Sequence, residues 1–295
     1  MPRKPLLLIV LIFSLSISGC SLVQQFPPNS QFNGQVTANI APKQTTPTAL
    51  SLPEYYLSER DQERLLQLLF TNGGCDLPCF WGITPGETTW DLADVFFGTF
   101  HKINTDVSVY TDASLPAYSV PLDFIDIKNR AVILGVYLTV DKEKVQRIAI
   151  YSEADSPEDL SYYWEYYSNQ WIFSQLGLPD EISFDVYQRN FDQNAGYDML
   201  LLYQKPKIAF WLSGIIRRDK VLCPQIHENG DINSIRMSIA NPDSDLEIYP
   251  PNWEFWSLRT GDDSLSTESV FGLSKEDFYQ RVLVDGINCF DVVMK

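Results

Sequence analysis

The chain is poor in the side chains that most often carry catalysis at neutral pH. It has two histidines, His101 and His227, which lie in different halves and do not form a His-x-x-x-His pair. Histidine is the side chain that most readily changes charge near neutral pH and is a common metal ligand. No phosphate-binding loop, dinucleotide fingerprint, serine-nucleophile elbow or zinc signature is present. We therefore expect no metal, no cofactor and no histidine-based active site.

Positive charge is also scarce. The 22 Lys and Arg residues are outnumbered by 38 Asp and Glu residues, and the formal net charge is −16. Nucleic acids and anionic lipid surfaces attract proteins through Lys and Arg. Nucleic acid is therefore not expected as a partner, and a lipid surface would repel the folded part. An acidic surface of this kind is typical of a soluble protein.

Long apolar runs are missing after the amino terminus. The one run that stands out is Leu6–Phe13, which follows two basic residues and is followed by mostly small residues up to Gly19 and Cys20. This order is typical of a secretory signal peptide. The run is shorter than the roughly 20 apolar residues that a spanning helix requires. An uncleaved membrane helix over residues 5–18 is the alternative.

The cysteine that directly follows these small residues resembles the lipobox of bacterial lipoproteins. The resemblance implies that residues 1–19 are a removed signal peptide and that the Cys20 thiol carries a diacylglycerol, with palmitate as the expected acyl group. Residues 20–52 would then be the lipid anchor and a disordered tether, because they are rich in Gln, Pro, Asn, Ser and Thr. We expect an extracytoplasmic protein that is held on the cell membrane or the outer membrane by its acyl chains.

Four cysteines remain once Cys20 is acylated, and an even number in an exported chain suggests two disulfides. Cys75 and Cys79 flank a short Asp-Leu-Pro loop that could close locally, which leaves Cys223 to pair with Cys289. These are the pairings we expect. A redox role for the first pair is the alternative, although its spacing differs from that of thioredoxin-like motifs.

The part after the tether alternates between helix and strand patterns. Ile235, Met237 and Ile239 alternate with polar residues, which is typical of a strand with one wet face. Helices are expected at 58–70, 89–98, 168–176 and after Ser274, and strands at 106–110, 119–127, 131–140, 145–151, 181–187, 197–204, 208–216 and 232–240.

A helix followed by four strands therefore occurs twice, with strand 145–151 corresponding to strand 233–239. This repeat predicts an α+β fold of two tandem helix-plus-antiparallel-sheet units, residues 53–155 and 156–295, the second ending in a short C-terminal helix. The alternative is a chance recurrence, since helices followed by strands are common in α+β proteins.

Two segments together resemble a family of uncharacterised bacterial lipoproteins and exported proteins. The first has the pattern Cys-x-Leu-Pro-Cys-x-Trp-Gly-Ile-x-Pro-Gly and covers residues 75–86. The second is a C-terminal block that begins with the segment from Gly272 to Tyr279 and ends at Cys289. The resemblance implies no assigned activity. A weaker resemblance, carried by Gly82–Thr88 and the apolar helix after it, is to small envelope lipoproteins of the BamE/SmpA type, which implies a scaffold.

Aromatic residues are the main candidates for a binding surface. Tyr163 and Trp164 lie in one aromatic segment, and Trp253 and Trp256 lie in another. Exposed rings would suit a glycan or a protein partner, whereas buried rings would belong to the core.

An acidic segment is a further candidate. Asp243, Asp245 and Glu247 alternate, and carboxylates at such spacing could hold calcium. The segment lacks the central glycine and the glutamate at the twelfth position of an EF-hand loop, so we expect a solvated acidic loop.

These observations predict a lipid-anchored cell-envelope protein that is a non-catalytic binding or scaffold module for an envelope protein or a glycan. The alternative is an extracytoplasmic hydrolase that acts on wall or glycan polymers through carboxylates. A deep pocket with two facing carboxylates would favour the enzyme. A shallow, exposed aromatic patch would favour binding.

Overall fold

The computed structural model describes residues 57–100, 115–125, 131–154, 157–188, 195–217, 220–224, 226, 231–248, 264–286 and 289–293. They belong to one compact unit, Ser51–Lys295. The signal peptide, Cys20, the whole tether and the strand expected at 106–110 lie outside the described residues and remain predictions. Within the described part, no helix is long and apolar enough to cross a membrane.

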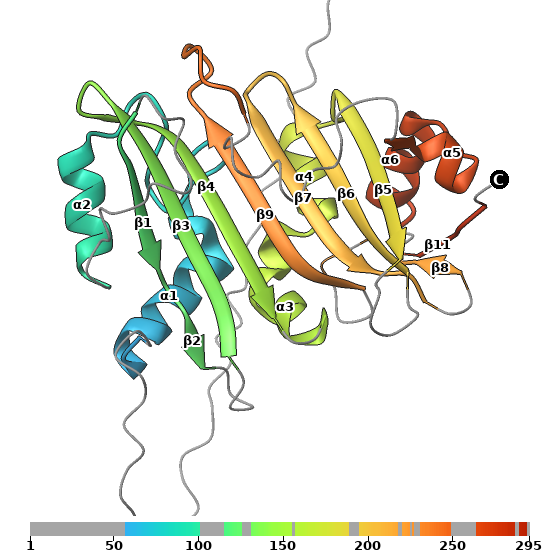
Figure 1. The fold of residues 1–295 in the computed structure, drawn as a ribbon, viewed down its shortest axis with the longest axis horizontal. Helices are drawn as coiled ribbons and strands as arrows, with labels where there is room; N and C mark the ends of the chain where they lie inside the picture. The colour runs from blue at the N-terminus through green and yellow to red at the C-terminus, as the bar shows by residue number, and fades with distance from the viewer. Residues whose placement is uncertain are drawn as a thin grey trace, which may run out of the picture. The chain divides into compact units, whose positions relative to one another are not determined.

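A mostly antiparallel sheet forms the centre of this unit and confirms the α+β class (Figure 1). Its order is β1-β3-β4-β9-β7-β6-β5-β10, and β2 also pairs with β3. The strands are β1 (Ala117–Pro121), β2 (Phe124–Ile125), β3 (Ala131–Asp141), β4 (Lys144–Ala154), β5 (Glu181–Gln188), β6 (Ala195–Tyr203), β7 (Ile208–Ile215), β9 (Ile232–Ala240) and β10 (Leu265–Ser266). A separate two-stranded sheet pairs β8 (Val221–Leu222) with β11 (Phe290–Asp291).

The two predicted units share this sheet. Strands β1, β3 and β4 neighbour one another in chain order, as do β5, β6, β7 and β9. The last strands of the two sets, β4 and β9, pair antiparallel with Ile150 opposite Met237. The sets are therefore joined by the two strands that the repeat predicted to correspond. The duplication itself and the boundaries 53–155 and 156–295 remain predictions.

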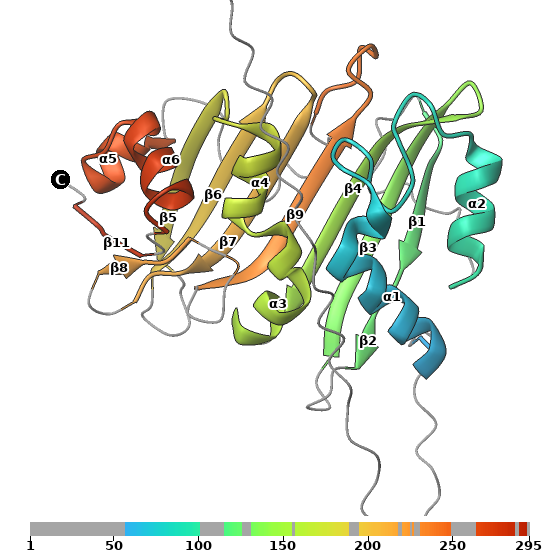
Figure 2. The same ribbon diagram turned by 180° about the vertical axis from the view of Figure 1, so that it is seen from behind.

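The described helices pack on one face of the sheet, as Figure 2 shows for α1, α3 and α4. Alternate residues such as Ile148 and Met237 point toward them and form the main core, because successive side chains of a strand point to opposite faces. The helices are α1 (Glu59–Thr71), α2 (Trp90–Gly98), α3 (Pro157–Trp164), α4 (Asn169–Leu176), α5 (Thr267–Phe271) and α6 (Lys275–Leu283). The other face carries a smaller apolar cluster that includes Ala149, Leu200 and Trp211.

Serine caps mark the start of α1 and α6, where helices were expected from residue 58 and after Ser274. The Ser58 side chain accepts a hydrogen bond from the Asp61 N–H, and the Ser274 side chain accepts one from the Asp277 N–H. Such caps satisfy a donor that the first helical turn leaves without a partner. Helix α1 then ends at Asn72, whose φ of 49° is left-handed.

The chain enters the described part at one end of the sheet. The Leu57 N–H donates to the Asp123 carbonyl, and the Asp123 carboxylate accepts the Leu134 N–H near the start of β3. Strand β3 has 11 residues, which at about 3.3 Å per residue span roughly 35 Å. The β3–β4 hairpin turn is therefore at the opposite end of the sheet from Leu57.

Candidate functional site

A pocket of about 680 Å³ lies at the end of the sheet where β3 turns into β4 and where β9 ends. We call it the hairpin-end pocket. Both segments are at the same end of the ribbon in Figure 1. Four parts of the chain meet here: the turn after the Cys75–Cys79 block, Leu115 just before β1, the β3–β4 hairpin and the loop after β9. The lining residues are Gly86, Leu115, Asp141, Lys142, Lys144, Gln146, Asn241, Asp243, Ser244, Asp245 and Leu246.

Backbone hydrogen bonds attach the hairpin to the segment that follows the cysteine block. The Gly86 N–H donates to the Val145 carbonyl at 2.7 Å, and the Val145 N–H donates to the Thr88 carbonyl at 3.0 Å. The first N–H of α2, at Trp90, donates to the Glu143 carbonyl at 2.7 Å. The Gly-Ile-x-Pro-Gly segment thus positions both α2 and the pocket rim, which gives this part of the block a structural role.

The hairpin turn itself has unusual backbone geometry. Lys142 and Glu143 have φ angles of 49° and 63°, and two left-handed residues are the signature of the tight turn that matches strand twist. Asparagine and glycine are preferred at these positions, and other residues there cost on the order of 1 kcal/mol or more each. The turn holds the Lys142 side chain in solvent at 90% exposure, 3.7 Å from the Asp141 carboxylate.

Gly86 and Asn241 form the floor of the pocket. Gly86 has a φ of 84°, and a Cβ at this position would lie 2.6 Å from the Asn241 side chain. The Asn241 amide donates to the Gln146 side-chain oxygen at 2.8 Å, and its backbone N–H donates to the Gln146 carbonyl at 2.8 Å. Only glycine leaves room for this amide pair, so steric exclusion explains why the block ends in a glycine, Gly86.

Two cationic side chains hold the loop at residues 241–248. Lys207 donates to the carbonyls of Ser244 and Leu246. Arg147, which is 2% exposed, donates to the Glu247 carbonyl at 3.3 Å. These hydrogen bonds to backbone carbonyls fix the path of the loop.

The acidic residues of this loop lie on the pocket wall. Asp243 and Asp245 are exposed, and neither carboxylate has a hydrogen-bond or ion-pair partner within the described residues. Among those residues, no group of three or more His, Cys, Asp and Glu is placed to hold a metal ion. Asp243, Asp245 and Glu247 therefore lie on an exposed acidic loop.

The hairpin brings positive charge to the same pocket. The Lys144 ammonium donates to the Gly86 carbonyl at 3.1 Å, and among the described residues it forms no ion pair. The hairpin therefore contributes Lys142 and Lys144, and the loop contributes Asp243 and Asp245. The arrangement can bind a polar, charged ligand between the two segments.

The disulfides Cys75–Cys79 and Cys223–Cys289 are both present, with Cα–Cα distances of 5.8 Å and 4.1 Å. The predicted pairing is thus confirmed. Neither disulfide lines the hairpin-end pocket, but the first closes the start of the block whose end forms the pocket floor.

Asn72 organises the loop of the first disulfide. Its buried amide donates to the carbonyls of Cys75 at 2.6 Å and Cys79 at 2.9 Å. Its side-chain oxygen accepts the Trp81 N–H at 3.2 Å and the Tyr167 hydroxyl at 2.9 Å. Burial raises the pKa of Tyr167 well above its ordinary value, so the hydroxyl keeps the proton that it donates.

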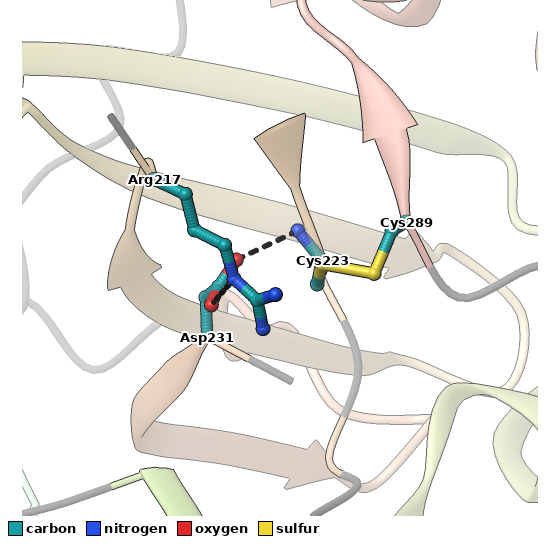
Figure 3. A network of polar contacts seen from close by, with 4 residues as sticks. All are labelled: Arg217, Cys223, Asp231 and Cys289. Atoms are coloured by element: carbon teal, nitrogen blue, oxygen red, sulfur yellow. Dashed lines mark hydrogen bonds and ion pairs between the residues drawn. A yellow bond between two sulfur atoms is a disulfide. The ribbon is translucent and has the colours of Figure 1, made fainter. Parts of the chain in front are cut away.

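The second disulfide is held by a different network (Figure 3). The Asp231 carboxylate accepts the Arg217 Nε–H at 2.7 Å and the Cys223 N–H at 3.0 Å. Phe290, directly after Cys289, pairs with Leu222 in the β8–β11 sheet. The carboxyl-terminal strand is therefore attached by a disulfide, a strand pairing and a charged hydrogen-bond network.

The structure corrects two of the predicted binding aromatics. Tyr163 and Trp164 are 2% and 0% exposed, and the Trp164 indole N–H donates to the Ser152 hydroxyl at 3.0 Å. They are core residues beneath the sheet, because α3 presents them to its helix-covered face. Trp253 and Trp256 lie outside the described residues and remain predictions, as does lipidation at Cys20.

The pocket itself was not predicted. Its lining includes Lys144, Gln146 and Asn241, for which the sequence carries no motif. One signal was available: Gly86 ends the block and precedes α2, and a glycine there indicates a close backbone approach. Such a signal says that something packs against Gly86 but not that Asn241 does.

Comparison of the chain with protein-family models, with curated proteins and with solved structures finds no significant match. The resemblances drawn from the sequence therefore stand as proposals. The functional argument rests on the geometry of the described residues.

Proposed function

We propose that this protein is a lipid-anchored binding module of the cell envelope that holds its ligand in the hairpin-end pocket. The observation that carries the proposal is the pocket itself. Its volume of about 680 Å³ falls in the range of small-molecule sites. It is assembled from distant segments of the chain, three of which are fixed by backbone hydrogen bonds around Gly86, Val145 and Asn241.

The position of the pocket suits an anchored protein. The tether joins the described part at Leu57, beside the start of β3, and the pocket lies about 11 residues away along that strand, at the Asp141 end. A protein held through its amino-terminal segment would keep this end of the sheet accessible to a ligand. The two disulfides fit an oxidising, extracytoplasmic compartment.

The character of the carboxylates favours binding over hydrolysis. Catalytic acids of glycosidases are held in apolar surroundings that keep them protonated near neutral pH. Asp243 and Asp245 are instead exposed to solvent. The weaker resemblance, to scaffold lipoproteins of the BamE/SmpA type, supports the same choice, and the resemblance to the uncharacterised lipoprotein family adds no activity.

Two measurements on the full-length lipoprotein test this proposal. Cys20→Ala should release the protein from salt-washed membranes, because an acidic domain has no other hold on lipid. A benzophenone photo-cross-linker in place of Lys142 should give ligand adducts in intact envelopes. The same cross-linker in place of Arg281, an exposed residue of α6, is the matched control and should give none.

Retention of the Cys20→Ala protein on salt-washed membranes contradicts the anchor. Equal adduct formation from positions 142 and 281 contradicts the pocket.

A further inference from the structure

The charges around the hairpin-end pocket are divided between its two sides. Lys144, on the hairpin, donates to the neutral Gly86 carbonyl and forms no ion pair among the residues that the structure describes. Asp243 and Asp245, on the loop after β9, likewise have no charged partner in that part of the chain. Lys142 and Asp141 form an exposed pair with each other. One ammonium and two carboxylates thus remain for a ligand.

The backbone that carries these groups is fixed before any ligand arrives. Lys144 lies directly after the left-handed turn that Trp90 fixes through the Glu143 carbonyl. The loop of Asp243 and Asp245 is fixed by Lys207 and by the buried Arg147. Preorganised charges lose less conformational freedom on binding and so contribute more to affinity.

Size and lining restrict the class of ligand further. A volume of about 680 Å³ is far more than a single ion occupies. None of the lining residues that the structure describes is aromatic, so among them the stacking surface that sugars and nucleobases commonly use is missing. The floor instead carries the paired amides of Gln146 and Asn241, groups that suit the peptide groups of a ligand.

Resting on the function proposed above, we infer that the hairpin-end pocket takes a zwitterionic amino acid or short peptide. The ligand ammonium faces Asp243 and Asp245, and the ligand carboxylate faces Lys144. A ligand with only one of these charges leaves the other side of the pocket without a partner and therefore binds with lower affinity.

Titration calorimetry of the full-length lipoprotein in detergent tests this inference with three probes. They are trialanine with free termini, its N-acetylated form and its C-terminal amide. Trialanine should bind at least tenfold more tightly than either capped form. Free alanine is the fourth probe: equal binding of alanine assigns the site to amino acids, and preference for trialanine assigns it to peptides, both within the inferred class.

Substitutions assign each charge to its side. Asp243→Asn with Asp245→Asn should weaken trialanine at least tenfold and leave the acetylated form unchanged. Lys144→Gln keeps a donor for the Gly86 carbonyl and should abolish the preference for the free acid over the amide. Glu276→Gln with Asp285→Asn removes the same charge from exposed positions in and after α6 and should change nothing.

Some results overturn the inference. Capped peptides that bind as tightly as trialanine would overturn it. Binding of calcium from calcium chloride alone, lost when Asp243 and Asp245 are substituted, would also overturn it. If no probe binds while position 142 captures a ligand in envelopes, the inferred ligand class is wrong but the proposal that the hairpin-end pocket binds a ligand is kept. If position 142 captures nothing either, both proposals fall.

Discussion

The two disulfide-bonded regions of the molecule differ in what holds them. Cys75 and Cys79 are four residues apart, and the loop between them is already fixed by the buried amide of Asn72. Cys223 and Cys289 are 66 residues apart, and the strand after Cys289 adds a single two-residue pairing. The first disulfide closes a loop that side chains also organise. The second attaches a tail whose other contacts include the packing of Phe290 against Phe271 and Phe278 and a hydrogen bond from the Val293 N–H to the Val270 carbonyl.

This difference teaches that sequence separation, and not the chemistry of the bond, decides what each disulfide contributes. In the chain-entropy account the stabilisation grows with the length of the closed loop. Local side-chain hydrogen bonds can replace a short cross-link but not a long one. Four substitutions test the comparison.

Removal of the long-range disulfide should have the largest effect. Cys223→Ser with Cys289→Ser should lower the free energy of unfolding by about 4 kcal/mol, the value for a loop of this length. Urea unfolding measures the change. A loss below about 1 kcal/mol would mean that α5, α6 and the β8–β11 pairing hold the tail without the bond.

Asn72→Ala should come second, at about 3 kcal/mol. It leaves two buried groups, the Trp81 N–H and the Tyr167 hydroxyl, without their partner, and each such group costs about 1–3 kcal/mol. The Cys75 and Cys79 carbonyls also lose a donor, but these two hydrogen bonds are only partly buried. Tyr167→Phe removes only the hydrogen bond from the Tyr167 hydroxyl and is the control, at about 1 kcal/mol. Equal losses for the two variants would show that Asn72 is not the organising residue.

Removal of the short disulfide should cost less than loss of Asn72. Cys75→Ser with Cys79→Ser should lower the free energy of unfolding by about 2 kcal/mol, because the closed loop is so short. Urea unfolding under the same conditions ranks it against the other two changes. A loss equal to that of the long-range pair contradicts the comparison.

Gly86→Ala should have the smallest effect on stability, about 1–2 kcal/mol from its left-handed backbone, but should disturb the pocket. The added Cβ would lie 2.6 Å from the Asn241 side chain. Gly98→Ala, where nothing lies within 4 Å, is the matched control in α2 and should be neutral or slightly stabilising. Thermal unfolding and trialanine binding are measured for both variants. Unchanged trialanine binding by Gly86→Ala would show that Gly86 does not contribute to ligand binding in the pocket.

Much of the local structure could be predicted from the sequence because it depends on neighbouring residues. The caps at Ser58 and Ser274 and the turn between β3 and β4 follow from local patterns. The predicted disulfide pairing is also confirmed, although its spacing argument left Cys223 and Cys289 to be paired by elimination. The aromatic segment gave no such guidance, since exposed and buried rings have the same composition.

The shared sheet and the pocket could not be predicted because they depend on which distant strands become neighbours. A period of two assigns Ile235 and Met237 to one face of a strand but says nothing of its neighbour. The pairing of β4 with β9 brings Asn241 beside Gln146 and Gly86. The identities of those three residues do not predict that they contact one another.

The central claim is that a ligand occupies the hairpin-end pocket when the protein is on its membrane. Lysine acetylation footprinting of intact envelopes tests it directly, because Lys142 is 90% exposed in the protein alone. Lys220, exposed near the other end of the sheet, is the internal reference. We predict that Lys142 reacts at least fivefold more slowly in envelopes than in the purified protein, while Lys220 reacts at the same rate in both. Equal rates for Lys142 in the two preparations would contradict the account.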